Sequence, residues 1–161
     1  MLSVRQPFAS ALFGPKPGEN REWRPTWEQL RPGDWLAIHA SVSLYVGARK
    51  MVNRWRWSDV VTFSARDDWG IWTGAPTLDS MPRNAIIGLL RYNGTMNSRN
   101  AWRQGDAWAN EVDCHYWQFS ERRPFEVPIV PPPAPPMAHA GLWLAPPDVV
   151  AIAESMGCVN G

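Results

Sequence analysis

The sequence has few of the residues that build metal, disulfide and redox sites. Its two cysteines, Cys114 and Cys158, lie far apart and form no Cys-x-x-Cys pair, and its three histidines are scattered. Zinc sites and disulfide frameworks need such residues in clusters or at characteristic spacings. We therefore expect two free thiols, no metal and no cofactor, in a protein of a reducing compartment such as the cytoplasm.

Membrane and catalytic signatures are also missing. No apolar run reaches the roughly 20 residues that cross a bilayer, and the first residues do not resemble a signal peptide. The sequence contains no Gly-x-Ser-x-Gly, no P-loop, no Gly-x-Gly-x-x-Gly and no His-Glu-x-x-His. We expect a protein that does not enter a membrane and that uses none of these catalytic motifs.

Charge is nearly balanced, with 16 Lys and Arg residues against 15 Asp and Glu residues. No overall field would attract a polyanion, so contact with RNA requires a local patch. Segment 43–57 is predicted to be a helix with an apolar stripe. Four cations take up much of its remaining surface: Arg49, Lys50, Arg54 and Arg56. This patch either is a solvated face or contacts RNA phosphates.

The length of 161 residues fits one domain with a core of useful size. Period-two patterns and turn signals predict strands at 2–4, 19–23, 34–41, 85–92, 114–120 and 125–130. Helices are predicted at 8–13, 43–57 and 147–156. Asn93-Gly94 is a strong turn signal. We expect an irregular insert at 58–80 and an extended, proline-rich tether at 131–136.

Two polar runs near the start of the chain are its most informative feature. Ser3-Val-Arg-Gln-Pro-Phe-Ala9 changes from strand to helix at its proline, which places Arg5 and Gln6 at a corner facing a cleft. Glu19-Asn-Arg-Glu-Trp23 puts a carboxylate, an amide, a guanidinium and an indole within five residues. That mixture is too polar for a core strand and suits the edge and face of a planar, polar ring.

These runs resemble the N-terminal half of an ASCH domain, a family of PUA-like β-barrels. The similarity continues, in the same order, through residues 33–41, 81–88, 116–119 with Arg123-Pro124, and 141–143. It covers most of the chain. The resemblance implies an α+β fold in a single domain over residues 1–161: a PUA-like, mostly antiparallel β-barrel of five or six strands, flanked by short helices.

The resemblance also implies binding of RNA, a nucleotide or a modified nucleobase in a polar and aromatic pocket at the barrel mouth. Amide and charged groups suit the edge of a base, and aromatic rings suit its face. The expected ligand-binding residues are Arg5, Gln6, Asn20, Trp23, His39, Ser41 and Trp117, and the expected RNA-backbone contacts are Arg49, Lys50 and Arg54. Two structural alternatives stay open: Arg5, Glu19 and Arg21 as an ion-pair network that closes the barrel, and His39 as a half-buried structural histidine.

An enzyme is the second functional hypothesis. Some small ASCH proteins remove the acyl group of N4-acetylcytidine with a lysine, a threonine three residues later and an arginine two residues beyond it. The matching positions here are Lys16, Glu19 and Arg21, with Lys16 expected in an exposed loop at 14–18. The missing hydroxyl excludes a covalent acyl-enzyme at this position. Glu19 could instead accept a proton from water while Lys16 stabilises the oxyanion. Ribonuclease activity is a further option that the resemblance implies, and a protein-interaction module is the third hypothesis.

Overall fold

The structure, a computed structural model, describes residues 1–57, 75–131 and 142–160. This part of the chain builds five strands, four helices and one short 3-10 turn. The strands are β1 (Leu2–Gln6), β2 (Gly18–Arg21), β3 (Trp35–Leu44), β4 (Ala85–Asn97) and β5 (His115–Ile129). The helices are α1 (Phe8–Ala11), α2 (Ala48–Trp57), α3 (Ser98–Arg103) and α4 (Pro147–Ser155), and the 3-10 turn is η1 (Leu78–Ser80).

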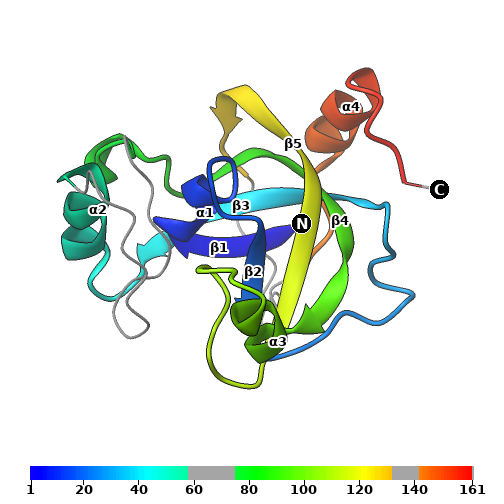
Figure 1. Cartoon of the computed structure of the whole chain (residues 1–161). Helices are drawn as coiled ribbons and strands as arrows, with labels where there is room; N and C mark the ends of the chain where they lie inside the picture. The colour runs from blue at the N-terminus through cyan, green and yellow to red at the C-terminus, as the bar shows by residue number, and fades with distance from the viewer. Residues whose placement is uncertain (58–74, 132–141, 161) are drawn as a thin grey trace.

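All five strands belong to one sheet with the order β1-β3-β4-β5-β2. β1 runs parallel to β3, and the other three pairs are antiparallel. The sheet curls into a half-barrel, with α2 and α4 at opposite ends and α3 beside β2 (Figure 1). The predicted α+β class with a mostly antiparallel, five-stranded sheet is confirmed, while the PUA-like barrel stays a prediction.

Both faces of the sheet are packed, and the predicted strand at 34–41 contributes side chains to each. Leu36 and Ile38 of β3 belong to the main core cluster, whereas Ala37 between them belongs to a smaller cluster with Val149 of α4. Side chains on a strand alternate between faces, so one strand serves both cores. Trp117 of β5 lies in the main cluster and is completely buried.

The predicted turn at Asn93-Gly94 is wrong. β4 continues through both residues to Asn97, and Gly94 pairs with Gln118 of β5. Gly94 has φ +119° and sits where the register shifts, which identifies a bulge. A bulge and a hairpin turn both need a residue with positive φ, and the glycine of an Asn-Gly pair can supply it in either case.

The predicted strands at 114–120 and 125–130 are a single strand, β5. Its middle stays paired with β4, since Arg123 lies opposite Leu89 and Pro124 opposite Gly88. A proline inside a ladder is tolerated on an edge. β2 pairs only with the first residues of β5, as far as Gln118, so no described strand lies on that side of β5 further along.

The other differences concern helix ends and the regions outside the description. α2 begins at Ala48 rather than at residue 43, because β3 continues to Leu44, which pairs with Gln6 of β1. The predicted helices at 8–13 and 147–156 correspond to α1 and α4. Most of the expected insert and tether, residues 58–74 and 132–136, lies outside the described residues. No described helix is both long enough and apolar enough to cross a membrane.

Candidate functional site at the seam of the half-barrel

β1 and β2 are the two edge strands of the sheet, and a side chain joins them. Nη2 of Arg21, at the end of β2, donates a hydrogen bond of 2.7 Å to the main-chain oxygen of Ser3 in β1. Glu19 and Arg21 alternate with Asn20, and Glu19 lies opposite the core residue Trp117. Both charged side chains therefore lie on the inner face of the half-barrel, at the seam where its two edges meet.

Lys16, Glu19 and Arg21, here called the seam cluster, lie together as the sequence suggests. Nζ of Lys16 is 2.5 Å from Oε2 of Glu19 and also donates to the main-chain oxygen of Gly18. Nη2 of Arg21 is 3.7 Å from the other oxygen of Glu19. One carboxylate thus lies between two cations.

The prediction that Lys16 lies in an exposed loop is wrong. Its side chain is only 2% exposed, and its Nζ lies 5.6 Å from the ring centroid of Phe8. The turn after α1 folds back, because the Lys16 N–H donates to the oxygen of Ala11. Gly18 lets β2 approach β5 closely, since a Cβ there would lie 2.5 Å from the main-chain oxygen of Trp117.

Burial and opposite charges act against each other on Lys16. Desolvation lowers the pKa of Lys16, and the Glu19 carboxylate, followed by a smaller effect of Asp106, raises it in part. Burial also raises the pKa of Tyr116 well above its ordinary value, and Asp106 adds to that effect. Asp106 therefore acts on both Lys16 and Tyr116 in this interior region.

Gln6 and Asn20 use their amides to hold the fold together. Nε2 of Gln6 donates to the oxygen of Pro82 at 2.7 Å, and its Oε1 accepts from the N–H of Ser10. Nδ2 of Asn20 donates to the oxygen of Trp108 at 2.8 Å. Oδ1 of Asn20 accepts from the Ser98 hydroxyl and from the Asn110 N–H. Gln6 is completely buried, and both amide atoms of Asn20 are already hydrogen-bonded. Neither amide therefore offers a free edge to a base in this conformation.

The expected stacking residues have different environments. Trp117 is completely buried, and its Nε1 donates to the main-chain oxygen of Trp23. The rings of Trp23 and Trp117 meet edge to face, with centroids 4.8 Å apart. Trp23 is half-buried, so of the two rings only Trp23 has surface near the seam.

His39 and Ser41 lie on β3, and Arg5 lies exposed on β1. Nδ1 of His39 is 2.9 Å from the Ser3 hydroxyl, and burial lowers the pKa of His39, an effect that Asn84 partly offsets. Oγ of Ser41 accepts from the Ser43 N–H. Ser3 connects this group to the seam cluster, since its main-chain oxygen accepts from Arg21.

The expected RNA-backbone residues form only part of a patch. Arg49 is exposed and lies 3.2 Å from the Asp79 carboxylate, which offsets its charge. Lys50 is exposed, and the side chain of Arg54 lies outside the described residues. The described part of α2 therefore presents one cation without a carboxylate partner.

Sequence reasoning missed three residues around the seam: Ser3, Asp106 and Tyr116. Asp106 comes from the segment after α3, which Asn20 ties to β2 through Trp108 and Asn110. No spacing in the sequence indicates that approach, because the segments are nearly 90 residues apart. Tyr116 alternates with Trp117 on a predicted strand, which indicates only that it lies on the opposite face.

No protein-family model matches the chain, and no curated protein matches it. Among the described residues, no group of three or more His, Cys, Asp or Glu residues could hold a metal ion. The interpretation of the site therefore depends on its own geometry.

Proposed function

We propose that the seam cluster binds the edge of a nucleobase or nucleoside in the cytoplasm, either free or as an unpaired residue of RNA. The observation that carries this proposal is the Glu19 carboxylate held beside the Arg21 guanidinium at the seam of the half-barrel. A carboxylate next to a guanidinium presents an acceptor beside a donor. That pattern complements the donor and acceptor groups along a base edge.

Unused hydrogen-bonding capacity supports a ligand at this place. Nε of Arg21 is buried and has no hydrogen-bond partner within the described structure. Among the described residues, Oε1 of Glu19 makes only the 3.7 Å contact with Arg21, which is too long for a strong hydrogen bond. Buried polar groups are almost always paired, so an unpaired donor beside a free acceptor favours a polar ligand.

A single base is a better candidate than a long RNA segment. The described cations of α2 are few, and Arg49 already has a carboxylate partner. Affinity for long RNA depends on many phosphate contacts. We therefore expect recognition through the base edge, with the half-buried Trp23 as the ring that a base could stack on.

Direct binding measurements test the proposal. Isothermal titration with cytidine, uridine, N4-acetylcytidine and a short single-stranded RNA should detect at least one ligand. Arg21→Lys keeps the charge but removes the planar donor pair, and should weaken that binding about tenfold or more. Arg91→Lys is the matched control, because Arg91 also pairs with a glutamate but lies on the exposed surface.

Two outcomes would overturn the proposal. One is the absence of binding by any of the four ligands to the folded wild type. The other is equal binding by wild type and Arg21→Lys, with circular dichroism showing that both are folded. If no ligand binds, Glu19 and Arg21 would serve only as an ion pair that closes the barrel, which is the structural alternative stated above.

Hydrolysis of an N4-acylated cytidine is the second candidate, and the 2.5 Å contact between Lys16 and Glu19 favours it. Glu19 would take a proton from water as the water oxygen attacks the acyl carbon. Lys16 has three N–H donors, of which two are used, and the third would stabilise the oxyanion. Breaking the C–N bond, with the proton passed to the leaving nitrogen, gives cytidine and a carboxylic acid.

Liquid chromatography with N4-acetylcytidine tests this candidate. Release of cytidine by the wild type, lost in Lys16→Ala and in Glu19→Gln and retained in Glu121→Gln, would support it. Absence of cytidine from the wild-type reaction would exclude this substrate. Activity that survives both seam substitutions would exclude this site.

A further inference from the structure

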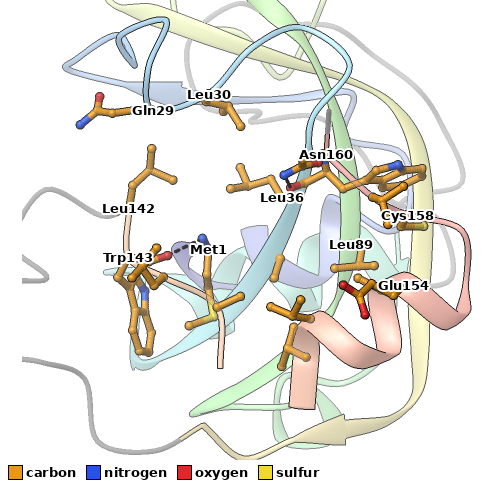
Figure 2. A pocket seen from close by; sticks show the side chains of 18 of the residues that line it. Met1, Gln29, Leu30, Leu36, Leu89, Leu142, Trp143, Glu154, Cys158 and Asn160 are labelled. Atoms are coloured by element: carbon orange, nitrogen blue, oxygen red, sulfur yellow. Dashed lines mark hydrogen bonds between the residues drawn. The ribbon is translucent and has the colours of Figure 1, made fainter. Parts of the chain in front are cut away.

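A cavity of about 650 Å³ lies between β3, α4 and the segment 142–145, and the seam cluster does not line it. Figure 2 shows Leu142 and Trp143 on one side of the cavity and Cys158 with Asn160 on the other. Leu36 of β3 lies between the two sides (Figure 2). Pockets for small organic ligands typically have volumes of about 300–1,000 Å³, so this cavity is large enough for one.

The walls of the cavity are mainly apolar, and its position is held by main-chain contacts. Trp35 and Trp143 supply two indole rings to the lining. The Trp143 N–H donates to the oxygen of Met1, and the side chain of Asn160 bonds both main-chain polar groups of Trp35. An apolar lining held by fixed walls is typical of a preformed ligand site.

The charged side chains that line the cavity are all acidic. They are Glu28, beside the turn before β3, and Glu154 on α4, and neither forms an ion pair within the described structure. Hydrogen bonds from its own backbone N–H and with Thr26, together with the nearby charge of Arg31, lower the pKa of Glu28, so its carboxylate is ionised at neutral pH. Burial lowers the pKa of the Met1 amine to about 6, so that group adds little positive charge there.

We propose that this cavity binds a small organic cation with an apolar body. The body would pack against Leu36, Leu142 and the Trp143 ring, and the ammonium group would lie near Glu28 or near Glu154. The proposal rests on charge complementarity: Glu28 and Glu154 are the charged side chains among the described residues that line a mainly apolar cavity, and neither forms an ion pair with a described residue. It does not depend on the function proposed for the seam cluster.

Three probes of the same shape and different charge test the proposal. They are naphthylmethylamine, which is a cation, naphthylmethanol, which is neutral, and naphthoate, which is an anion. Two-dimensional NMR of the isotope-labelled protein follows the indole N–H signals of Trp35 and Trp143 during titration. We expect the amine to bind about three- to tenfold more tightly than the alcohol, and the carboxylate to bind least.

Variants separate the effect of the Glu28 and Glu154 charges on binding from the effect of the shape of the cavity. The double variant Glu28→Gln/Glu154→Gln should bind amine and alcohol equally well and leave the affinity for the alcohol unchanged. Glu126→Gln is the control, because Glu126 is exposed and lies outside the cavity lining, so its preference for the amine should persist. Ala153→Phe fills space in the lining and should weaken all probes.

Either of two results would overturn the proposal. One is that no probe shifts the signals of Trp35 and Trp143 in the folded wild type. The other is that amine, alcohol and carboxylate bind equally well, or that the double variant keeps the preference for the amine. Equal binding would describe an apolar cavity without selection for charge.

Discussion

Glu19 and Glu121 each lie between two cations, at almost the same distances. Glu19 is 2.5 Å from Lys16 and 3.7 Å from Arg21, and Glu121 is 2.6 Å from Arg91 and 3.7 Å from Arg123. They differ in burial: the Glu19 side chain is 12% exposed and that of Lys16 is 2% exposed, against 40% for Glu121 and 45% for Arg91. The same contacts therefore have different consequences. Water replaces a lost partner at the surface, but not at the seam.

The largest expected difference is in stability after loss of the carboxylate charge. Glu19→Gln leaves the buried Lys16 without its opposite charge and should lower the free energy of unfolding by about 3–5 kcal/mol. Glu121→Gln should lower it by less than about 1 kcal/mol. Urea unfolding of both variants measures the two values. Equal losses would show that burial does not distinguish the two sites.

A double substitution asks whether the charges at the seam are needed for stability at all. Lys16→Met/Glu19→Leu removes both charges of the closest pair together, and Arg21, which is 19% exposed, is then the only charged residue left in the seam cluster. It should be roughly 2 kcal/mol less destabilising than Glu19→Gln alone, because apolar groups often replace a buried ion pair without loss. Urea unfolding again gives the values. A double variant less stable than the single variant would contradict this account.

His39 sharpens the comparison as a buried ionisable group without a charged partner. Burial lowers the pKa of His39 below its ordinary value of 6.5, so the unfolded chain takes up this proton more readily than the folded protein. The contribution of neutral His39 to the free energy of unfolding is therefore fully present above pH 6.5 and is lost as the pH falls below that value. The slope is at most about 1.4 kcal/mol per pH unit.

Urea unfolding of wild type and His39→Gln at a series of pH values measures that contribution. The wild type should lose more stability on acidification than the variant does. His115→Gln is the control, since His115 lies half-buried at the start of β5. If His39→Gln loses as much stability on acidification as the wild type, His39 does not contribute.

The smallest expected effect is the response to salt. A double-mutant cycle on Arg91 and Glu121 should give a coupling of about 0.5 kcal/mol that decreases towards zero at high salt. The same cycle on Lys16 and Glu19 should change little, because salt screens buried charges poorly. Thermal or urea unfolding at low and high salt measures both. A strong salt response at the seam would mean that water reaches Lys16.

Elements whose residues follow a regular hydrophobic pattern within one segment could be predicted from the sequence. The alternation in residues 34–41 identified both faces of β3, and the apolar spacing in residues 147–156 identified α4. The resemblance to the ASCH family grouped Lys16, Glu19 and Arg21, and the structure brings their charged atoms together. Their separation of only five positions along the chain makes this contact a local one.

The remaining features depend on contacts between distant segments. Lys16 is buried because the turn after α1 folds back onto the sheet, and the amide of Asn20 is used up by residues about 90 positions away. The continuity of β5 through Pro124 follows from its pairing with β4. No periodicity within one segment reports such contacts, so neither burial nor free hydrogen-bonding capacity could be predicted from the sequence.

The side of β5 that pairs with no described strand beyond Gln118 has a consequence for self-association. An unpaired strand edge is a template on which a second chain can add a strand, which is a common route to aggregation. Pro124 and Pro128 lie in the part of β5 beyond its pairing with β2, and proline has no N–H to donate. Each proline removes one N–H donor from this part of β5, which makes it a poorer template for an added strand.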